Sequence, residues 1–532
     1  MRSLRSGTAQ FFALFSASLL LAVAGQWFTG VYQNDLSQWP DEGCHYINGL
    51  LVHDYVADGL PGNPLQYALQ YYVHYPRVTI GHWPPFFYLI QAALYFLTGP
   101  STHVALLLQA ILGAMTATTV GCVVGRLGGW SPGLLATITT LAAPEIFVGT
   151  QSVMLDVPIT LLSCLAMLAW ARFLLEETWP WSFAFAAAAA AAIMTKGNGI
   201  FLALVPPLSL AVTGRLRLLL NWRFWLPAPV VAMMTLPWYL VTYKTTANAF
   251  IDTWGHFVIE AVPGYGRLLP EQIGLVGLLF AMLGTLRVLL DREWSWRHAL
   301  GISAVCVLVA GFAFTCVVPA GIESRYLAPL VPALVILSYL GIEWLLRSQA
   351  SMTRTVVLGM SFLAILAAES SFPETTSRAM NAASNGIFAA NGNNPFILVG
   401  STGAGEGALT AEIATQDRKR QKYVVRGFAT LGSGDFMGTD YLPRFETSGD
   451  EARWIEERGI GWVVVDTSPS SLVWKHNALL LEIAQSGRQG WSLVGRFPNS
   501  KGETLLYSVS LTGKAVDSTE LLSTAPARMV GW

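Results

Sequence analysis

Two adjacent acids, Asp41 and Glu42, are the residues best suited to acid–base chemistry, because a carboxylate beside a hydroxyl group can accept its proton. They lie in a segment with many aromatic side chains, of the kind that collects at membrane–water interfaces. We expect the nearby His45, Tyr46 and His82 to bind substrate there, together with Tyr326 from a later part of the chain. The combination predicts a site for a lipid-borne substrate, although a solvated loop beside an interfacial aromatic belt would have the same composition.

Asp156 is a further candidate catalytic acid. It opens an apolar run as Asp156-Val157-Pro158, and an acid before proline at a helix start also serves ordinary helix capping. If Asp156 and Asp41 lie on one face of a membrane, the two carboxylates could share a divalent cation or divide base and positioning roles. The sequence offers no complete set of metal ligands. It therefore identifies no certain cofactor. Binding of a divalent cation by Asp41 and Asp156 stays an open alternative.

Three cations are candidates to bind the phosphate of a donor. Lys196 lies in a glycine-bearing turn, Arg325 begins an apolar run and is followed by Tyr326, and Arg267 lies in the segment 245–270. An arginine can hold a phosphate through two parallel hydrogen bonds. The alternative for Lys196 and Arg325 is snorkelling at an interface, and the alternative for Arg267 is a surface position in a loop.

The composition shows what must position these residues. Of the 532 residues, 53% are hydrophobic and 12% are charged, whereas soluble domains have about 25% charged residues. This excludes an ordinary water-soluble enzyme. With Lys+Arg 32 against Asp+Glu 33, there is no basic excess for binding nucleic acid.

A helix needs about 20 apolar residues to cross the hydrocarbon core. On this criterion the chain is a polytopic α-helical membrane protein with about 11 transmembrane helices. The expected spans are 10–31, 103–125, 130–149, 156–175, 180–195, 197–213, 224–243, 271–290, 299–319, 325–346 and 354–371. The shorter, proline-led run 84–99 is predicted to be a juxtamembrane helix.

Basic loops predict the orientation, because Lys and Arg are retained on the cytoplasmic side. Arg2, Arg5 and the arginine-rich loop 214–223 place the N-terminus in the cytoplasm. Counting spans then places the loop 32–83 and everything after 371 on the outer side. The membrane is expected to be the cell inner or plasma membrane. The first span also resembles a signal peptide, and an uncleaved span is the preferred interpretation.

The chain after residue 371 differs in composition from the part before it. Residues 372–395 are rich in Ser, Asn and Gly and are predicted to be a linker. Residues 396–515 alternate short β-rich runs with helical patterns, which predicts a small extracytoplasmic α/β domain, followed by a tail at 516–532. The glycine-rich stretch 401–407 after the first of these runs could cradle a phosphate, and a structural turn is the preferred interpretation. The catalytic domain is expected to be 1–371, including the loop 32–83 and the helix 84–99.

Several of these features, taken in order along the chain, resemble the GT-C superfamily of membrane glycosyltransferases. The resemblance is to bacterial relatives of protein O-mannosyltransferases and of the lipid A aminoarabinose transferase, and it covers about residues 10–345. The matching features are Asp41-Glu42 in the first outer loop, Pro84-Pro85, Asp156, Lys196-Gly197 and Arg325-Tyr326 with Pro329. Family members with a lysine before the Pro-Pro pair differ from this chain, which has His82-Trp83 there.

The resemblance implies a GT-C fold and transfer of a sugar from a polyprenyl phosphate to a protein, lipid or glycan of the cell envelope. Asp41 would be the base, with Glu42 and Asp156 as further catalytic acids. Lys196 and Arg325 would contact the donor phosphate. Direct displacement would invert the anomeric centre.

Two other classes of function stay open. A flippase or transporter of lipid-linked sugars would place ionisable groups at the bilayer midplane and would show repeats. A membrane-anchored binding protein would act through its outer domain.

Overall fold

The computed structural model describes residues 2–510 apart from 80, 244–253, 292, 348–351, 354, 358, 361–362, 364–374, 391–393 and 435–439. The predicted span 354–371 lies largely outside the described residues, and the predicted tail 516–532 lies wholly outside them. The chain divides into two compact units. The first comprises Met1–Thr29, Gly81–Phe87 and Leu107–Pro373, and the second comprises Gly30–Ile80, Tyr88–Leu106 and Glu374–Trp532.

The first unit is helical in its described residues. Its elements are α1 (Arg2–Phe28), α5 (Thr102–Gly128, whose start belongs to the second unit), α6 (Trp130–Ala142), α7 (Pro144–Thr150), α8 (Asp156–Glu176), α9 (Trp179–Ile193), η1 (Gly197–Leu204), α10 (Val205–Thr213), η2 (Leu216–Leu220), α11 (Trp222–Trp225), α12 (Pro227–Val241), α14 (Trp254–Leu268), η3 (Leu269–Gln272), α15 (Gly274–Leu290), α16 (Trp296–Val317), η4 (Ser324–Leu330) and α17 (Val331–Leu345).

Fewer helices are long enough to cross a membrane than the sequence predicts. Six of the described helical stretches are long and apolar enough, and up to eight if each of two bent pairs is one span. The bent pairs are 130–142 with 144–150, at 66°, and 255–272 with 274–290, at 102°. The predicted spans 180–195 and 197–213 correspond to apolar helices of 17 residues or fewer. The difference from the predicted eleven arises because proline, glycine and 3-10 turns break apolar runs that a hydropathy reading joins.

Glycines allow two of these helices to pack closely. A Cβ atom at Gly284 of α15 would overlap the Leu337 carbonyl of α17, and one at Gly341 of α17 would overlap the Phe280 carbonyl. Small residues at such crossings let helix backbones approach where lipid offers no hydrophobic drive for association. The fully buried Trp170 of α8 lies in the same core cluster as residues of α16 and α17, so α8 is held from several sides.

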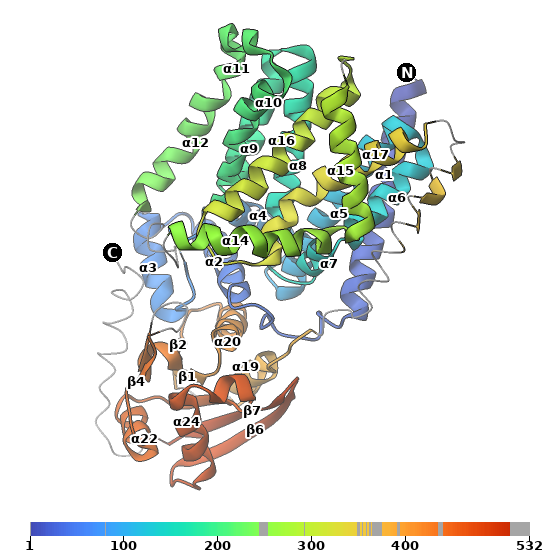
Figure 1. Ribbon diagram of the computed structural model, residues 1–532. Coiled ribbons are helices and arrows are strands. Elements are labelled where there is room, and N and C mark those ends of the chain that lie inside the picture. The colour runs from blue at the N-terminus through green and yellow to red at the C-terminus, as the bar shows by residue number, and fades with distance from the viewer. Residues whose placement is uncertain are drawn as a thin grey trace. The chain divides into compact units, whose positions relative to one another are not determined.

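The second unit contains helices and a mixed sheet. The strands of the sheet are drawn in orange and red in Figure 1. Its helices are α2 (Glu42–Ala57), α3 (Pro64–His74), α4 (Phe86–Thr98, which begins in the first unit), α19 (Met380–Ala389), α20 (Gly403–Gln416), α21 (Gly427–Thr430), α22 (Ser448–Glu457), α23 (Pro469–Leu472) and α24 (Lys475–Gln485). Its strands are β1 (Phe396–Gly400), β2 (Tyr423–Arg426), β3 (Gly432–Ser433), β4 (Leu442–Pro443), β5 (Trp462–Asp466), β6 (Trp491–Asn499) and β7 (Gly502–Val509).

The main sheet has the order β2-β1-β5-β7-β6, with β2, β1 and β5 parallel and β7 and β6 antiparallel. The strands β1, β2, β5 and β7 lie on the β-rich runs at 396–400, 422–427, 461–466 and 503–509, from which the sequence predicts strands. The edge strand β6 was not predicted, because Gly495 and Pro498 interrupt its pattern and most of its side chains are not buried. A β-bulge at Gly495 accommodates the irregularity.

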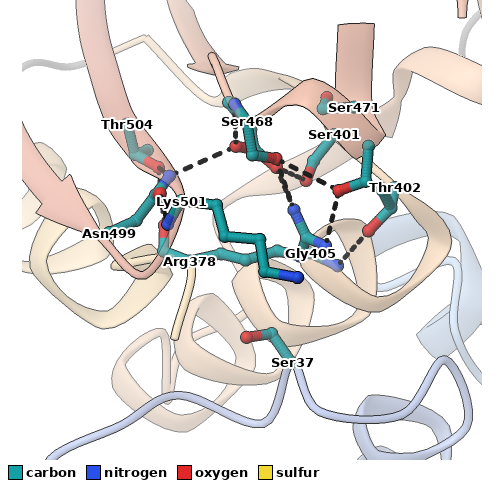
Figure 2. Close-up of polar contacts among 12 residues, drawn as sticks. Ser37, Arg378, Ser401, Thr402, Gly405, Ser468, Ser471, Asn499, Lys501 and Thr504 are labelled. Carbon is teal, nitrogen blue, oxygen red and sulfur yellow. Dashed lines mark hydrogen bonds and ion pairs between the residues drawn. The ribbon is translucent and has the colours of Figure 1, made fainter. Parts of the chain in front are cut away.

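The segment 372–395, predicted to be a linker, contains the helix α19. Arg378 of this segment is hydrogen-bonded to residues at and just after the end of the parallel strand β5. Figure 2 shows Arg378, just before α19, reaching the carboxyl ends of the parallel strands. Its guanidinium donates to Asp466 (2.6 Å) and Ser468 (2.8 Å), and the Asp466 carboxylate also accepts from Ser401 (2.6 Å). Within the predicted linker, residues Met380–Ala389 form the helix α19, whose first backbone N–H donates to the Asp35 carboxylate.

The compact units group the outer loop differently from the predicted domains. Residues 30–79 and 88–106 belong to the same compact unit as the chain after 374. For example, the buried Asp35 accepts the backbone N–H of Met380 at 2.6 Å, and the Tyr75 hydroxyl donates to Asp417 at 3.1 Å. Composition could not predict this grouping, since the loop and the sheet are separated by about 300 residues of apolar chain.

A buried acid gives the second unit a pH-dependent stability. Glu451 of α22 is fully buried, neither of its oxygens has a hydrogen-bond partner in the described chain, and burial raises its pKa to about 9. The folded protein holds a proton there that the unfolded chain releases above its ordinary value of 4.5. Stability from this group is therefore full below pH 4.5 and is lost as the pH rises toward 9.

We expect the thermal unfolding temperature of the detergent-solubilised protein to fall between pH 6.5 and 9, and Glu451→Gln to flatten that decline. Burial also lowers the pKa of His476 to about 4, so its stability effect lies below its ordinary value of 6.5 and leaves this window clear. An equal decline in the Glu451→Gln protein would contradict the assignment.

Candidate active site

Asp156 and Lys196 form a buried ion pair in the first unit. The Lys196 ammonium lies 2.6 Å from Oδ1 of Asp156, and the two side chains are 14% and 4% exposed. Asp156 is the first residue of α8, and Lys196 precedes η1 in a tight turn. A Cβ atom at Gly199 would lie 2.7 Å from the backbone of α9, so this turn requires glycine there. The structure thus joins two residues that the sequence predicts separately.

Tyr326 connects this pair to the second predicted cation. The Lys196 ammonium lies 4.8 Å from the Tyr326 ring centroid, and the Arg325 guanidinium lies 5.4 Å from it. Arg325 is also paired with Glu323 at 2.5 Å. A cation near an aromatic face is held electrostatically while its other hydrogens remain available. The short helix η4 therefore holds Arg325 and Tyr326 close to the start of α8.

Glu145 is a site residue that the sequence interpretation missed. It lies in α7, its side chain is hydrogen-bonded to Ser324, and it interacts electrostatically with Asp156 and Arg325. Gln272 also donates to Ser324, at 2.9 Å. The signal was present, because an acid inside the predicted span 130–149 is a functional candidate by default.

The charges of this cluster determine what it can bind. Lys196 and Arg325 each have a carboxylate partner, Asp156 and Glu323, and Glu145 adds a third acid. An anionic ligand would therefore have to compete with these carboxylates for the two cations. Oδ2 of Asp156 is buried and has no hydrogen-bond partner in the described chain, so it can still accept a proton or a hydrogen bond.

The predicted acid pair divides into two roles in the second unit. Glu42 is 2% exposed, and its carboxylate accepts the backbone N–H groups of Gln38 (2.9 Å) and Trp39 (3.0 Å). It therefore shapes the turn that leads into α2. Asp41 is the N-cap residue of α2, is only partly buried, and does not use its side chain to cap the helix. Of the two, only Asp41 has a carboxylate that solvent reaches.

The predicted substrate-binding residues His45 and Tyr46 are buried within the second unit. Nδ1 of His45 lies 2.8 Å from the Tyr88 hydroxyl, and the Tyr46 hydroxyl lies 2.9 Å from that of Thr415. The sequence did not predict Tyr88 and Thr415 as partners, because both lie far from His45 and Tyr46 along the chain.

Two further predicted residues are His82 and Arg267. His82 contacts Trp83, with ring centroids 4.4 Å apart. Arg267 is exposed on α14 and has no ion pair within the described ranges. The loop expected at 245–270 is thus a helix over Trp254–Leu268, where Pro263 is tolerated. The described residues give no contact between Arg267 and the donor-site candidates.

A shared cation between Asp41 and Asp156 stays a prediction, since the two acids belong to different units. Within the described chain, no group of three or more His, Cys, Asp or Glu side chains could hold a metal ion.

We expect Lys196→Met to destabilise the protein by about 3–5 kcal/mol, because it leaves the buried Asp156 carboxylate uncompensated. The double variant Asp156→Asn/Lys196→Met should recover most of that loss. Chemical denaturation in mixed micelles measures both. Arg217→Ala is the control, because Arg217 is 73% exposed in its ion pair and should cost less than about 1 kcal/mol. Additive losses in the double variant would disprove the coupling.

Comparison with known proteins gives one family match. The protein-family model described as dolichyl-phosphate-mannose-protein mannosyltransferase matches residues 82–241. This stretch includes Asp156 and Lys196 but neither Asp41 nor Arg325. No curated protein matches the chain.

Solved structures match over nearly the whole length. ArnT from Cupriavidus metallidurans in the apo state has 16% identity and a TM-score of 0.58, covering 94% of this chain and 99% of its own. The same protein bound to undecaprenyl phosphate has 17% identity and a TM-score of 0.56, covering 95% and 99%. The Archaeoglobus fulgidus oligosaccharyltransferase in complex with Zn and sulfate has 12% identity and a TM-score of 0.52, covering 85% and 67%. The chain is therefore an integral membrane protein with the GT-C glycosyltransferase fold, similar to ArnT and, over residues 82–241, to the dolichyl-phosphate-mannose-protein mannosyltransferases.

Proposed function

We propose that this protein is a glycosyltransferase that moves a sugar from a polyprenyl-phosphate donor to a protein, lipid or glycan acceptor of the cell envelope. The observation that carries the proposal is the cluster of Asp156, Lys196, Tyr326 and Arg325 at the start of two long apolar helical stretches, 156–176 and 324–345. Apolar helices suit an isoprenoid tail, and the cations suit the phosphate to which the tail is attached. A protein of the same fold has been crystallised with undecaprenyl phosphate.

In this reaction the acceptor oxygen attacks the anomeric carbon, and the bond from that carbon to the phosphate oxygen breaks. Asp41 takes the acceptor proton as general base. The polyprenyl phosphate leaves with the bonding electron pair, and Lys196 and Arg325 stabilise its growing negative charge. A single displacement inverts the anomeric centre.

The ion pairs in the cluster give the donor site its selectivity for phosphate. Glu323 pairs with Nε of Arg325, and a guanidinium can hold a phosphate through two parallel hydrogen bonds. Lys196 is oriented by Asp156 and by the Tyr326 ring. Asp156 is thus a positioning acid at the donor phosphate as well as a candidate catalytic one.

Orientation follows from the basic loops. The arginines of 214–223 and the N-terminal arginines are assigned to the cytoplasm, which puts Asp41, the donor site and the C-terminal residues on the extracytoplasmic side. Transfer would then use a lipid-linked donor where nucleotide sugars are scarce.

We expect Arg325→Ala to weaken binding of undecaprenyl phosphate about tenfold or more, because a charge-assisted contact is lost. The measurement is the rise in unfolding temperature of the nanodisc-embedded protein as this lipid is added. Arg217→Ala is a matched control, since Arg217 is an exposed arginine away from this cluster. Equal binding by wild type and Arg325→Ala would remove Arg325 from the donor site.

We expect Asp41→Asn to abolish transfer while leaving insertion and folding intact. Lipids would be extracted from a deletion strain carrying wild type, Asp41→Asn or the exposed-acid control Glu457→Gln, and polyprenyl-phosphate sugars profiled by mass spectrometry. One such sugar should accumulate with Asp41→Asn and not with the other two. Three identical profiles would count against the proposed function and favour transport or binding.

A further inference from the structure

Arg77, at the end of the outer loop, is a buried cation that the proposed chemistry does not yet use. It is 5% exposed and lies in the second unit with Asp41. Its Nη2 donates to the backbone carbonyl of Gly403 and lies 3.8 Å from Oε2 of Glu406. Both partners belong to the first turn of α20, so the loop's arginine is fixed by the part of the chain that follows residue 374.

The helices α2 and α20 meet beside Arg77. A Cβ atom at Gly43 would overlap the Gly407 carbonyl, so the first turn of α2 crosses α20 in backbone contact. A Cβ atom at Gly407 would lie 3.6 Å from both Nε of Arg77 and the Pro40 carbonyl. Pro40 immediately precedes Asp41. The residues on either side of Asp41 are therefore packed against α20 and Arg77.

The buried charges around Glu406 do not balance. Glu406 is fully buried and accepts from Nε of Arg426 at 2.8 Å and from the Phe428 backbone N–H at 2.8 Å. Arg77 and Arg426 thus share one carboxylate, which leaves one positive charge uncompensated within the triad. Asp41 is among the groups whose charge attracts Arg77.

We propose that Arg77 is a positioning residue for Asp41: anchored by Gly403 and Glu406, it fixes the start of α2. This inference rests on the proposed function, in which Asp41 is the base. Nη1 of Arg77 also lies 4.0 Å from Sγ of Cys44, in the first turn of α2. The α/β domain therefore acts on the reaction through the geometry of the outer loop.

Arg77→Met tests the inference, and Arg77→Lys tests whether charge alone restores function. Arg77→Met leaves Glu406 paired with Arg426 as a neutral couple, so the fold should survive. Arg496→Ala is the control, because Arg496 is an exposed arginine of the same unit.

Hydrogen–deuterium exchange of purified full-length protein measures anchoring. Peptides covering 38–57 should exchange about tenfold faster or more in Arg77→Met, because one charge-assisted hydrogen bond is lost, and less so in Arg77→Lys. Unchanged exchange in Arg77→Met would overturn the anchoring role, whether or not the protein is a transferase.

The rate of transfer measures the effect on the reaction. Purified variants are added to detergent-solubilised membranes of the deletion strain, and loss of the accumulated polyprenyl-phosphate sugar is followed. The rate should fall about tenfold or more in Arg77→Met, because the start of α2 loses a charge-assisted contact, and Arg77→Lys should restore part of it. A wild-type rate in Arg77→Met would overturn the positioning role. No sugar consumption by wild type would instead refute the proposed function, and the exchange result would stand.

Discussion

A lysine buried against an aspartate at the start of an apolar helix is the interaction on which the helical unit's chemistry depends. An isolated charge in such surroundings is very costly, and the pairing of Asp156 with Lys196 offsets the cost of burying both. Their pairing fixes the start of α8 relative to the turn after α9. Tyr326 and Arg325 can then be placed against the same ammonium, which gathers residues from three parts of the chain.

Ion pairs and hydrogen bonds between distant segments also hold the second unit together. Its outer loop buries apolar side chains such as Tyr46, Ile47 and Tyr71, and several of its polar groups bond to the chain after residue 374. Arg420 pairs with Asp58, Tyr75 donates to Asp417, and Asp35 receives the start of α19. Through these contacts the loop acquires a defined shape. The loop also contributes the partly exposed acid Asp41.

The sequence singles out Asp156, Lys196 and Arg325 one by one, since charges beside apolar runs are rare, and the structure adds how they pair. Glu145 carried the same signal, an acid inside a predicted span, and was overlooked. The strands β1, β2, β5 and β7 were predictable from β-branched runs, whereas β6 was hidden by Gly495 and Pro498. The pairing of Arg77 with Glu406 could not be predicted, because contact across more than 300 residues depends on the folded structure.

The discontinuity of the second unit has a consequence for biogenesis. Residues 30–79 are synthesised early, and the strands and helices that complete their packing are synthesised last. Until then Arg77 lacks its partner Glu406, and Gly43 of α2 cannot pack against Gly407 of α20. A nascent or truncated chain ending near residue 375 would hold its membrane helices and still lack a formed acidic turn. The packing of this loop is thus completed late, after the strands and helices that follow residue 374 have been synthesised.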